Sequence, residues 1–563
     1  MMANNMNQPM IILPEGTERF KGRDALHQNI YASKILASIV RTTLGPKGQD
    51  KMLVDKMGDV VVTNDGVTIL REMDIAHPAA RMLVDIAKNQ EDIVGDGTTT
   101  AVIIAGELLS EAEKLLDKGI PAPIILKGYQ DAVDKTLEIL EDIAIDASDD
   151  ETLRKVAKTA LTGKGSDYAK DKLAEIVVDA CSSVIEDGKV QNKHINTQRI
   201  NGNSIEQSTI VDGILIDNTP IDPKMPRDIK DAKIALLKYP IEIRDLTTNA
   251  KIDLSSPSAM DAFLANEQEM LKDLVQKLSD AGANVLMCQK GIDETAEQYL
   301  KQAGIVAFKR VKNSDMERLV YATGGKIVLD VEDISSDDLG HAGHIYTEKI
   351  FDQEITFFKD LEDSKAISII LRGSTRHVTG ELARAMDDAI GVVSATIEDG
   401  QVVIGGGAPE IELSRRLRSY SESVSGKEQL AINSFARALE VVPRTLAENA
   451  GLDTVDIIAE LIGAHENSNT MGLDVYNGKV VDMSDEVVEP LRVKKQAITS
   501  ATEAAQMIIR IDDMVAANGA LNATGSEDDG LDHSGIPHDA EGNITGMPGA
   551  GGMGPMGGMP PMM

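Results

Sequence analysis

The segment 95–100 has the residue types of a phosphate-binding loop. It reads Gly-Asp-Gly-Thr-Thr-Thr and runs directly into the apolar stretch 101–105. Gly95 and Gly97 permit a tight turn, and the free N–H groups at a helix start favour an anion such as phosphate. The Asp96 carboxylate would repel a phosphate unless Mg²⁺ lay between them. The segment therefore predicts a nucleotide-phosphate loop with its own metal ligand, although an ordinary capped helix after a turn also fits it.

Three other loops add to the nucleotide interpretation. Residues 44–48 read Leu-Gly-Pro-Lys-Gly, a rigid turn with a lysine that could contact a phosphate. Residues 64–68 read Asn-Asp-Gly-Val-Thr and place a carboxylate on a turn, and 405–407 are three glycines that let backbone approach a ligand closely. Taken singly, the three are equally typical of a solvated turn, a plain hairpin and a flexible joint.

Three carboxylates could serve the hydrolysis of a nucleotide. This reaction needs Mg²⁺ on the phosphates and a group that orients the attacking water. Asp96 and Asp65 lie on the turns just described, and Asp388 lies in the segment Ala-Met-Asp-Asp-Ala at 385–389. Asp387 and Asp388 are also typical of a solvated helix face.

Several other kinds of site are excluded. The chain has no GxxxxGK[ST] motif, and its nearest approach, Leu-Thr-Gly-Lys-Gly at 161–165, fails the pattern. No GxGxxG follows a strand, so a Rossmann dinucleotide site is not supported. His341 and His344 have no acidic or cysteine partner in pattern, and we expect them on a surface loop without a metal.

Composition and charge narrow the class of protein further. Apolar residues make up 42% of 563, which indicates a globular chain with several cores, and aromatic residues only 3%. The net charge of −34 opposes binding to nucleic acid or to an anionic membrane. At ~1 M salt the Debye length falls to roughly 3 Å, so self-repulsion would be screened. A salty cytoplasm is therefore a reasonable hypothesis.

Cysteine content and the absence of apolar segments favour the cytoplasm. Cys181 and Cys288 are far apart and outside any CxxC pattern, so we expect neither a disulfide framework nor a zinc site. The stretch 1–16 lacks the pattern of a signal peptide, and no apolar run approaches ~18 residues.

The hydrophobic pattern changes twice along the chain. Residues 20–145 are mostly helical in pattern, apart from a β-like piece at 57–63 that ends in the Asn-Asp-Gly hairpin signal at 64–66. From about 200 to 370, short apolar runs at 234–237, 284–287 and 367–371 alternate with helical stretches, which indicates an α/β domain.

One long helix is expected inside the α/β region. Ser256 can cap it, Pro257 suits its first position and Gly282 its end. We expect its C-terminal half to pack on the domain and its apolar N-terminal half to project toward a partner, while a fully packed helix is the alternative.

The last third is helical again. We expect a helix over 381–393, a strand at 402–404, and helices through most of 411–465 and 495–517. From about 522 the periodicity ends, and 546–563 holds only Gly, Met, Pro and one Ala, as a mobile tail would. Helical character at both ends fits one domain built from the two ends, with another inserted between them.

Together, the four loops resemble those of the group II chaperonins of the TCP-1/cpn60 family, to which the archaeal thermosome subunits belong. Loop order, loop spacing and the Gly/Met tail all match, from about Gln8 to Ala516. The resemblance implies a multidomain α and α/β chaperonin fold. Its parts would be a mostly helical equatorial domain (1–148 and 404–521), a small intermediate hinge domain (149–216 and 372–403), an α/β apical domain (217–371) with a helical lid protrusion at about 243–275, and a flexible tail (522–563).

The resemblance also implies an activity. It is that of an ATP-dependent molecular chaperone whose subunits form a double ring and fold unfolded client proteins in a chamber closed by a built-in lid. The cofactors would be ATP and Mg²⁺, the enzymatic activity an ATPase, and the partners client proteins and same-family subunits in a homo- or hetero-oligomeric ring.

Site residues follow from the resemblance position by position. Asp96 would bind Mg²⁺, and Asp65 and Asp388 would position and activate water at the γ-phosphate. Glu489 is similar to the family position near the ribose, and Lys164 to its γ-phosphate sensor. The remaining nucleotide contacts would be Leu44, Gly45, Pro46, Gly95, Gly97, Thr98, Thr99, Thr100, Gly406 and Gly407. The family often has Gly-Met-Asp-Lys where this chain has Gly-Gln-Asp-Lys at 48–51, a local change that we expect to leave ATP binding intact.

Two other functions compete with this one. A passive holdase would use the apical tip without ATP, but it leaves the phosphate loops unexplained. A small-molecule kinase would use ATP, but the sequence carries no small-molecule signature. A refolding assay with and without ATP distinguishes the holdase from an ATP-driven chaperone. The size of the oligomer distinguishes the kinase from a double ring.

Overall fold

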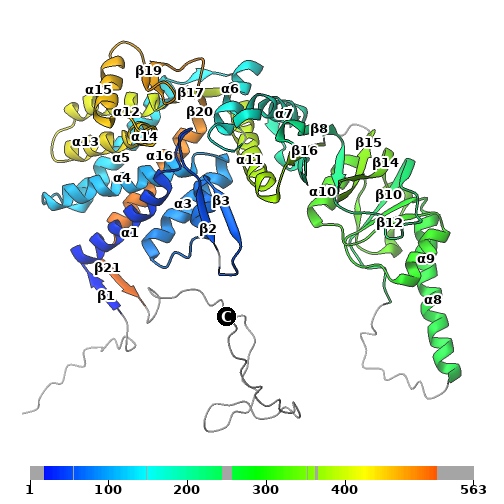
Figure 1. Ribbon diagram of the computed structural model, residues 1–563. Coiled ribbons are helices and arrows are strands. Elements are labelled where there is room, and N and C mark those ends of the chain that lie inside the picture. The colour runs from blue at the N-terminus through cyan, green and yellow to red at the C-terminus, as the bar shows by residue number, and fades with distance from the viewer. Residues whose placement is uncertain are drawn as a thin grey trace, which may run out of the picture.

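Three groups of elements follow one another in an arc, each around a hydrophobic core of its own (Figure 1). This computed structural model describes residues 18–54, 56–147, 149–165, 167–243, 257–351, 353–361 and 366–516. The expected tail from 522 and the expected helix cap Ser256 lie outside these ranges.

The first group is helical and combines both ends of the chain. Its main core contains buried residues from Ile30 to Leu140 and again from Val403 to Ile509. Its helices are α1 (Arg23–Arg41), α2 (Gly66–Glu72), α3 (Pro78–Val94), α4 (Thr98–Asp117), α5 (Ala122–Asp142), α12 (Ala408–Ser423), α13 (Glu428–Leu439), α14 (Val441–Asn449), α15 (Thr454–Ala464) and α16 (Leu491–Ile509). The helical prediction for 20–145 and 411–465 is thus confirmed.

Short strands complete this group and correct two predictions. Strand β2 (Lys51–Val54) forms an antiparallel hairpin with β3 (Val60–Thr63). The hairpin turn therefore precedes β3, and Asn64 and Asp65 lead into α2 instead, because Asp65 caps that helix. The predicted helix to 517 ends at Ile509, and β21 (Asp513–Ala516) pairs with β1 (Glu18–Lys21). The other strands are β4 (Ile145–Asp146), β17 (Gln401–Ile404), β18 (Met471–Asp474), β19 (Lys479–Asp482) and β20 (Val488–Pro490).

The second group lies in the middle of the arc (Figure 1). Its core joins buried residues of α6 (Asp150–Leu161), α7 (Lys170–Ser183) and α11 (Arg376–Asp399). Its three-stranded sheet has the order β7-β16-β8, with β7 (Ile195–Asn201) parallel to β16 (Ile367–Gly373) and β8 (Thr209–Asp212) antiparallel. A small hairpin of β5 (Ile185–Glu186) and β6 (Lys189–Val190) completes it.

The third group is an α/β layer structure, as the alternation of strands and helices predicted. Among the described residues, seven strands share one sheet of order β12-β11-β10-β14-β15-β9, with β13 also paired to β10. The strands are β9 (Ile214–Ile216), β10 (Asp228–Leu237), β11 (Val285–Cys288), β12 (Val306–Phe308), β13 (Ile327–Val328), β14 (Gly340–Ile350) and β15 (Gln353–Lys359), and the helices are α8 (Pro257–Asp280), α9 (Glu294–Gln302) and α10 (Asn313–Thr323).

Strand pairing cuts across two of the expected domain boundaries. Strand β9 precedes residue 217 but pairs with β15 in the large sheet. Strand β16 precedes residue 372 but pairs with β7 and β8 in the second group. A five-residue cluster around Ile200, Leu215 and Ile370 packs where the two sheets meet.

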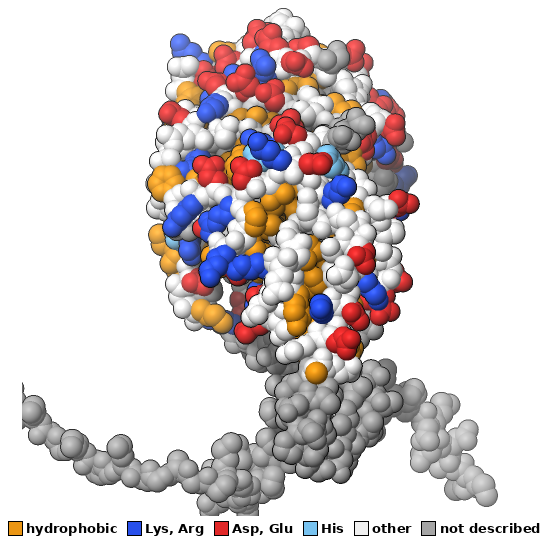
Figure 2. All heavy atoms as spheres, turned by 90° about the vertical axis from the view of Figure 1, so that its right-hand side faces the viewer, with side chains coloured by type: hydrophobic (Ala, Val, Ile, Leu, Met, Phe, Trp, Pro, Cys, Tyr) orange, Lys and Arg blue, Asp and Glu red, His pale blue; other side chains and the backbone are white. Residues whose placement is uncertain are grey.

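Helix α8 is the long helix that the sequence predicts. Pro257 is its first residue, and Gly282, with φ of +89°, follows its end. Leu271, Val275 and Leu278 bury its C-terminal half in the core, while its N-terminal end extends beyond the sheet (Figure 1). Figure 2 views this end of the molecule, where hydrophobic side chains lie in the middle of the face between basic ones and acidic ones gather above.

The two histidines of 340–344 are not on a loop, contrary to expectation. Both lie on β14, where His341 Nε2 contacts Asp231 at 2.8 Å and His344 Nε2 contacts Asp228 at 3.2 Å. In the described ranges no helix is both long and apolar enough to cross a bilayer.

Candidate active site

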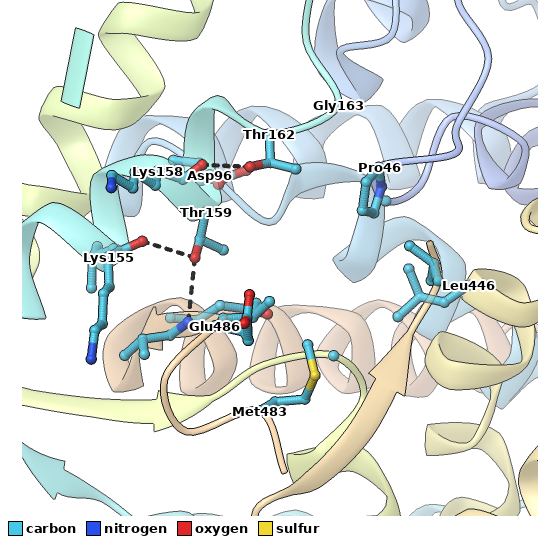
Figure 3. Close-up of a pocket in the computed structure, with 18 of the residues that line it drawn as sticks. Pro46, Asp96, Lys155, Lys158, Thr159, Thr162, Gly163, Leu446, Met483 and Glu486 are labelled. Carbon is cyan, nitrogen blue, oxygen red and sulfur yellow. Dashed lines mark hydrogen bonds between the residues drawn. The ribbon is translucent and has the colours of Figure 1, made fainter. Parts of the chain in front are cut away.

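One cavity of about 1080 Å³ lies where the predicted loops meet. This exceeds most small-molecule sites, which hold roughly 300–1,000 Å³. Figure 3 shows Pro46 and Leu446 on one side of the cavity, Lys155 and Thr159 on the opposite side, and Met483 and Glu486 below. Every site residue that the resemblance implies lines this cavity except Gly95. Lys47, a possible phosphate contact in the sequence, does not line it, and its ammonium lies 5.0 Å from the centre of the Tyr476 ring.

The start of α4 faces the cavity without a side-chain cap. Its N-cap is Gly97, in the left-handed region with φ of +80°. A β-carbon on Gly97 would lie 2.8 Å from Cγ1 of Val493, so only glycine fits there. Thr98, Thr99 and Thr100 form the first helical turn and line the cavity. Uncapped N–H groups with the helix dipole behind them suit an anion.

Gly95 positions the loop although it does not line the cavity. It ends α3 with φ of +79°, and a β-carbon on it would lie 3.1 Å from Cα of Gly391 in α11. This close packing brings the loop against the helix that carries Asp388. Asp96 follows, with its Oδ1 accepting a hydrogen bond of 2.7 Å from the N–H of Gly97.

Lys164 and Asp388 form a partly buried ion pair in the cavity. Burial raises the pKa of Asp388, and the nearby Asp96 and Asp65 carboxylates add to this, against the opposing effect of Lys164. Burial alone would lower the pKa of Lys164, but the same three carboxylates hold it above its usual value. Three carboxylates thus surround one ammonium, and the excess negative charge suits a cation.

The carboxylates fit Mg²⁺ only in one way. Among the described residues no group of three or more His, Cys, Asp or Glu could hold a metal alone. Mg²⁺ commonly takes one or two carboxylates and completes its octahedron with substrate phosphates and water. The donor set therefore fits Mg²⁺ that arrives with a nucleotide, and Asp96 is the carboxylate beside the uncapped start of α4.

Asp65 is held rigidly as the N-cap of α2. Its Oδ1 accepts from the N–H of Val67 at 3.3 Å, and its Oδ2 accepts from the N–H and hydroxyl of Thr68 at 2.9 and 2.6 Å. A carboxylate has about four acceptor positions, so one remains for a water molecule. A cap alone would explain these bonds, but Asp65 also lines the cavity.

Close backbone packing shapes the side of the cavity near Pro46. Gly45 has φ of +80°, and a β-carbon there would lie 2.3 Å from Cδ2 of Leu446. Gly163, also with φ of +80°, packs against Gly45 and Pro46. Asn64 donates from Nδ2 to the carbonyl of Gly163, while its buried Oδ1 has no hydrogen-bond partner among the described residues.

The remaining glycines border an apolar end of the cavity. Gly406 and Gly407 have φ of +68° and +82°, and a β-carbon on Gly407 would lie 2.7 Å from Pro443. Leu446, Leu473, Val475 and Met483 line the cavity here. A cavity with both an apolar wall and an uncapped helix start suits a molecule with a flat base and a phosphate chain.

The sequence analysis missed several lining residues, among them Asn64, Leu446, Met483 and Lys494. One signal was available for Lys494: it occupies a position on the apolar face of α16, between the buried Val493 and Ala497. A charge at such a position needs a buried partner.

Comparisons with known proteins agree with the resemblance. The profile of the TCP-1/cpn60 chaperonin family matches residues 36–519. Thermosome subunit alpha of Methanothermobacter thermautotrophicus is 59% identical over 93% of this chain and 96% of the relative, and subunit beta of the same organism is 55% identical over 99% of both. Thermosome subunit 1 of Haloferax volcanii is 51% identical over 93% of this chain and 94% of the relative.

Proposed function

The chain belongs to the TCP-1/cpn60 chaperonin family, and we propose that it binds and hydrolyses ATP to drive protein folding as a subunit of a double-ring complex. The observation that carries the ATP part is the cavity, where an uncapped helix start, a partly buried lysine and three carboxylates meet. The function is that of an archaeal group II chaperonin.

The start of α4 would bind the phosphates, and Asp96 would hold Mg²⁺. When bound, Mg²⁺ would neutralise charge on the phosphate chain. The Lys164 ammonium would contact the γ-phosphate, and Gly45, Pro46, Gly406 and Gly407 would border the nucleotide. The close approach of these glycines to their neighbours supports this, because any β-carbon would change the shape of the walls.

Asp65 and Asp388 would orient the attacking water. Asp65 is fixed by its capping bonds, and Asp388 is fixed by Lys164. In this arrangement a γ-phosphate would compete with Asp388 for the lysine. Asp388 would then be released to accept a proton from water, and its raised pKa makes it a better base than an exposed carboxylate.

Helix α11 is the candidate element that transmits movement from the cavity to the rest of the molecule. Asp388 lies in its middle, and its first turn packs on β16, where a β-carbon on Gly373 would lie 2.8 Å from Thr379. We propose that the first group is the equatorial domain, the second the intermediate domain and the third the apical domain. Because of the strand pairing, β9 goes with the apical domain and β16 with the intermediate one.

The β2–β3 hairpin is the candidate contact between subunits. It extends from the helices of the first group (Figure 1) and exposes Met52, Val54, Met57, Val60 and Val62. Exposed apolar clusters mark interaction sites, and a hairpin edge can pair with a strand of another chain. We propose that it docks on a neighbouring copy or on another subunit of the same family.

Client proteins would bind the apical domain, and α8 with the segment before it would form the lid. The projecting end of α8 supports this (Figure 1); residues 244–256 of the expected protrusion lie outside the described ranges. We place the protein in the cytoplasm, and its two cysteines, both free and buried, suit a reducing compartment.

A refolding assay with electron microscopy tests this proposal. Purified protein should form stacked rings and should refold a denatured client in the presence of Mg²⁺ and ATP but not without nucleotide. Refolding that is equal with and without ATP would leave a passive holdase as the function.

A further inference from the structure

An ion triad with two buried members, Lys494 and Glu410, and one partly buried member, Glu489, joins the cavity to the start of α12. The Lys494 ammonium, in α16, lies 2.8 Å from Oε1 of Glu410 and 2.8 Å from Oε2 of Glu489. The Lys494 residue is 4% exposed and the Glu410 residue 1%. Lys494 and Glu489 line the cavity, whereas Glu410 lies behind them in the first turn of α12.

Glu410 has a single visible role in this triad. Its Oε1 accepts a hydrogen bond from the Lys494 ammonium, and its buried Oε2 has no hydrogen-bond partner among the described residues. A buried charge that is only half satisfied is costly, and well-packed apolar side chains would often be at least as stable. A role in holding the Glu489 side chain in position therefore explains the triad better than a contribution to the stability of the fold.

Glu489 lines the cavity and has one carboxylate oxygen that is not paired with Lys494. It lies in β20 and pairs across the sheet with Val403 of β17, the strand that leads into the glycine loop 405–407. Its Oε2 is taken by Lys494, and its Oε1 lies beside Gly405, where a β-carbon would be 2.8 Å away. Oε1 is thus the oxygen that can accept a hydrogen bond from a molecule in the cavity.

We propose that Lys494, anchored by Glu410, is a positioning residue that holds the Glu489 carboxylate in place to accept a hydrogen bond from a ribose hydroxyl of the bound nucleotide. This inference rests on the proposed ATP site. The sugar is the part of a nucleotide between its phosphates and its base. Glu489 lies beside Gly405, next to the two glycines at the apolar end, and is also close enough to Asp96, beside the start of α4, for that charge to raise its pKa.

Electrostatics gives the lysine a second effect on the same carboxylate. Burial raises the pKa of Glu489, and the charges of Glu410 and Asp96 add to this, while Lys494 opposes it. Without the ammonium, Glu489 would more readily take up a proton and would lose its fixed partner. A protonated or displaced carboxyl could not accept the hydroxyl in the same way.

The test compares binding of ADP, 2′-deoxy-ADP and 3′-deoxy-ADP by calorimetry, so that no hydrolysis is involved. Lys494→Met should weaken the affinity for ADP by about tenfold, which corresponds to the loss of one charge-assisted hydrogen bond. The same variant should bind the analogue that lacks the recognised hydroxyl with an affinity within about twofold of that of the wild type. Lys495→Met is the matched control, because the neighbouring Lys495 pairs with Glu141 on the surface instead, and it should bind all three ligands as wild type does.

Because Lys494→Met leaves the buried Glu410 carboxylate without a partner, this variant could fail to fold, and a second variant is needed as a control. Lys494→Met/Glu410→Gln removes that unpaired charge and should show the same discrimination between ADP and one deoxy analogue. Equal weakening of all three ligands, or no weakening of any, in the folded double variant would overturn the inference. Wild-type protein that binds no ADP would contradict the proposed function itself, whereas wild-type binding with an unaffected variant contradicts only the role of Lys494.

Discussion

Lys164 and Asp388 form a partly buried ion pair across 224 positions of sequence. The lysine lies in the turn after α6, and the aspartate lies in α11 on the other side of the inserted third group. The pair joins two chain segments of the second group at the cavity that the first group lines. A change at the phosphate end can therefore be transmitted to α11 through one contact.

Removing the charge of the two proposed water-orienting carboxylates should abolish turnover but not binding. We expect Asp65→Asn/Asp388→Asn to bind ATP within about threefold of wild type and to lose at least 100-fold in hydrolysis, a typical effect of losing general-base catalysis. Asparagine caps helices as well as aspartate does, so α2 should keep its start. Phosphate release and ATP affinity are measured on the same preparation, and normal turnover would show that the assignment is wrong.

Gly97 and Gly119 offer a matched test at the two ends of α4. Both have positive φ, +80° and +77°. A β-carbon on Gly97 would clash with Val493 beside the cavity, whereas one on Gly119 would meet nothing within 4 Å. Each alanine variant should lose about 1 kcal/mol of stability from backbone strain, and Gly97→Ala should lose more because its β-carbon also clashes with Val493. Only Gly97→Ala should also weaken ATP binding, by about tenfold or more.

Measurement of ATP affinity and of the thermal midpoint separates the two effects of these variants. Equal nucleotide affinity in Gly97→Ala and Gly119→Ala would mean that the start of α4 does not contact phosphate.

Local patterns predicted much of the helical part and of the cavity. The Gly-Asp-Gly-Thr-Thr-Thr segment and the Gly45-Pro46 turn are local features, and their backbone conformations follow from glycine and proline within a few residues. Asp388 was a candidate from the sequence but also fitted a solvated helix face, and the family resemblance then favoured its role in catalysis. The resemblance alone supplied Lys164, which no local pattern distinguishes from a solvated turn.

Long-range pairing accounts for most of what was missed. The β7-β16-β8 sheet joins segments about 170 residues apart, so hydrophobic spacing could not assign β16 to it. The Asn-Asp-Gly segment gave a wrong hairpin position because an aspartate before a helix and one in a β-turn look alike in sequence. Glu410 and Lys494 were missed since each is one charge in a helix, and only the fold brings them together.

Both cysteines should resist alkylation in the native protein. Burial raises the pKa of Cys181 to about 12 and that of Cys288 to about 11. Because the thiolate is the reactive form, its fraction at pH 8 should be very small and should rise toward that of a free thiol, with pKa about 8.5, only on unfolding. Iodoacetamide labelling followed by mass spectrometry, with and without guanidinium, checks this; rapid native labelling of either residue would contradict it.

Molar salt should favour the assembled, folded state. With a net charge of −34, each subunit repels itself and its neighbours, and ~1 M salt shortens the Debye length to roughly 3 Å. We expect the thermal midpoint and the fraction in large complexes to rise between 0.05 and about 1 M KCl. Light scattering and calorimetry over this range measure both, and equal values at the two ends would remove the argument for a salty cytoplasm.

The β2–β3 hairpin should be required for assembly but not for folding of the subunit. Met52 and Val54 are 69% and 63% exposed, so glutamates there bury no charge in the isolated chain. In a subunit interface, the same glutamates would be desolvated, at a cost of several kcal/mol per contact. Met52→Glu/Val54→Glu should therefore run as a small species in size-exclusion chromatography with scattering detection, with unchanged circular dichroism. Leu329→Glu, at a residue of the third group that is 66% exposed, is the control and should still form rings. Intact rings in the hairpin variant would show that the contact between subunits lies elsewhere on the subunit surface.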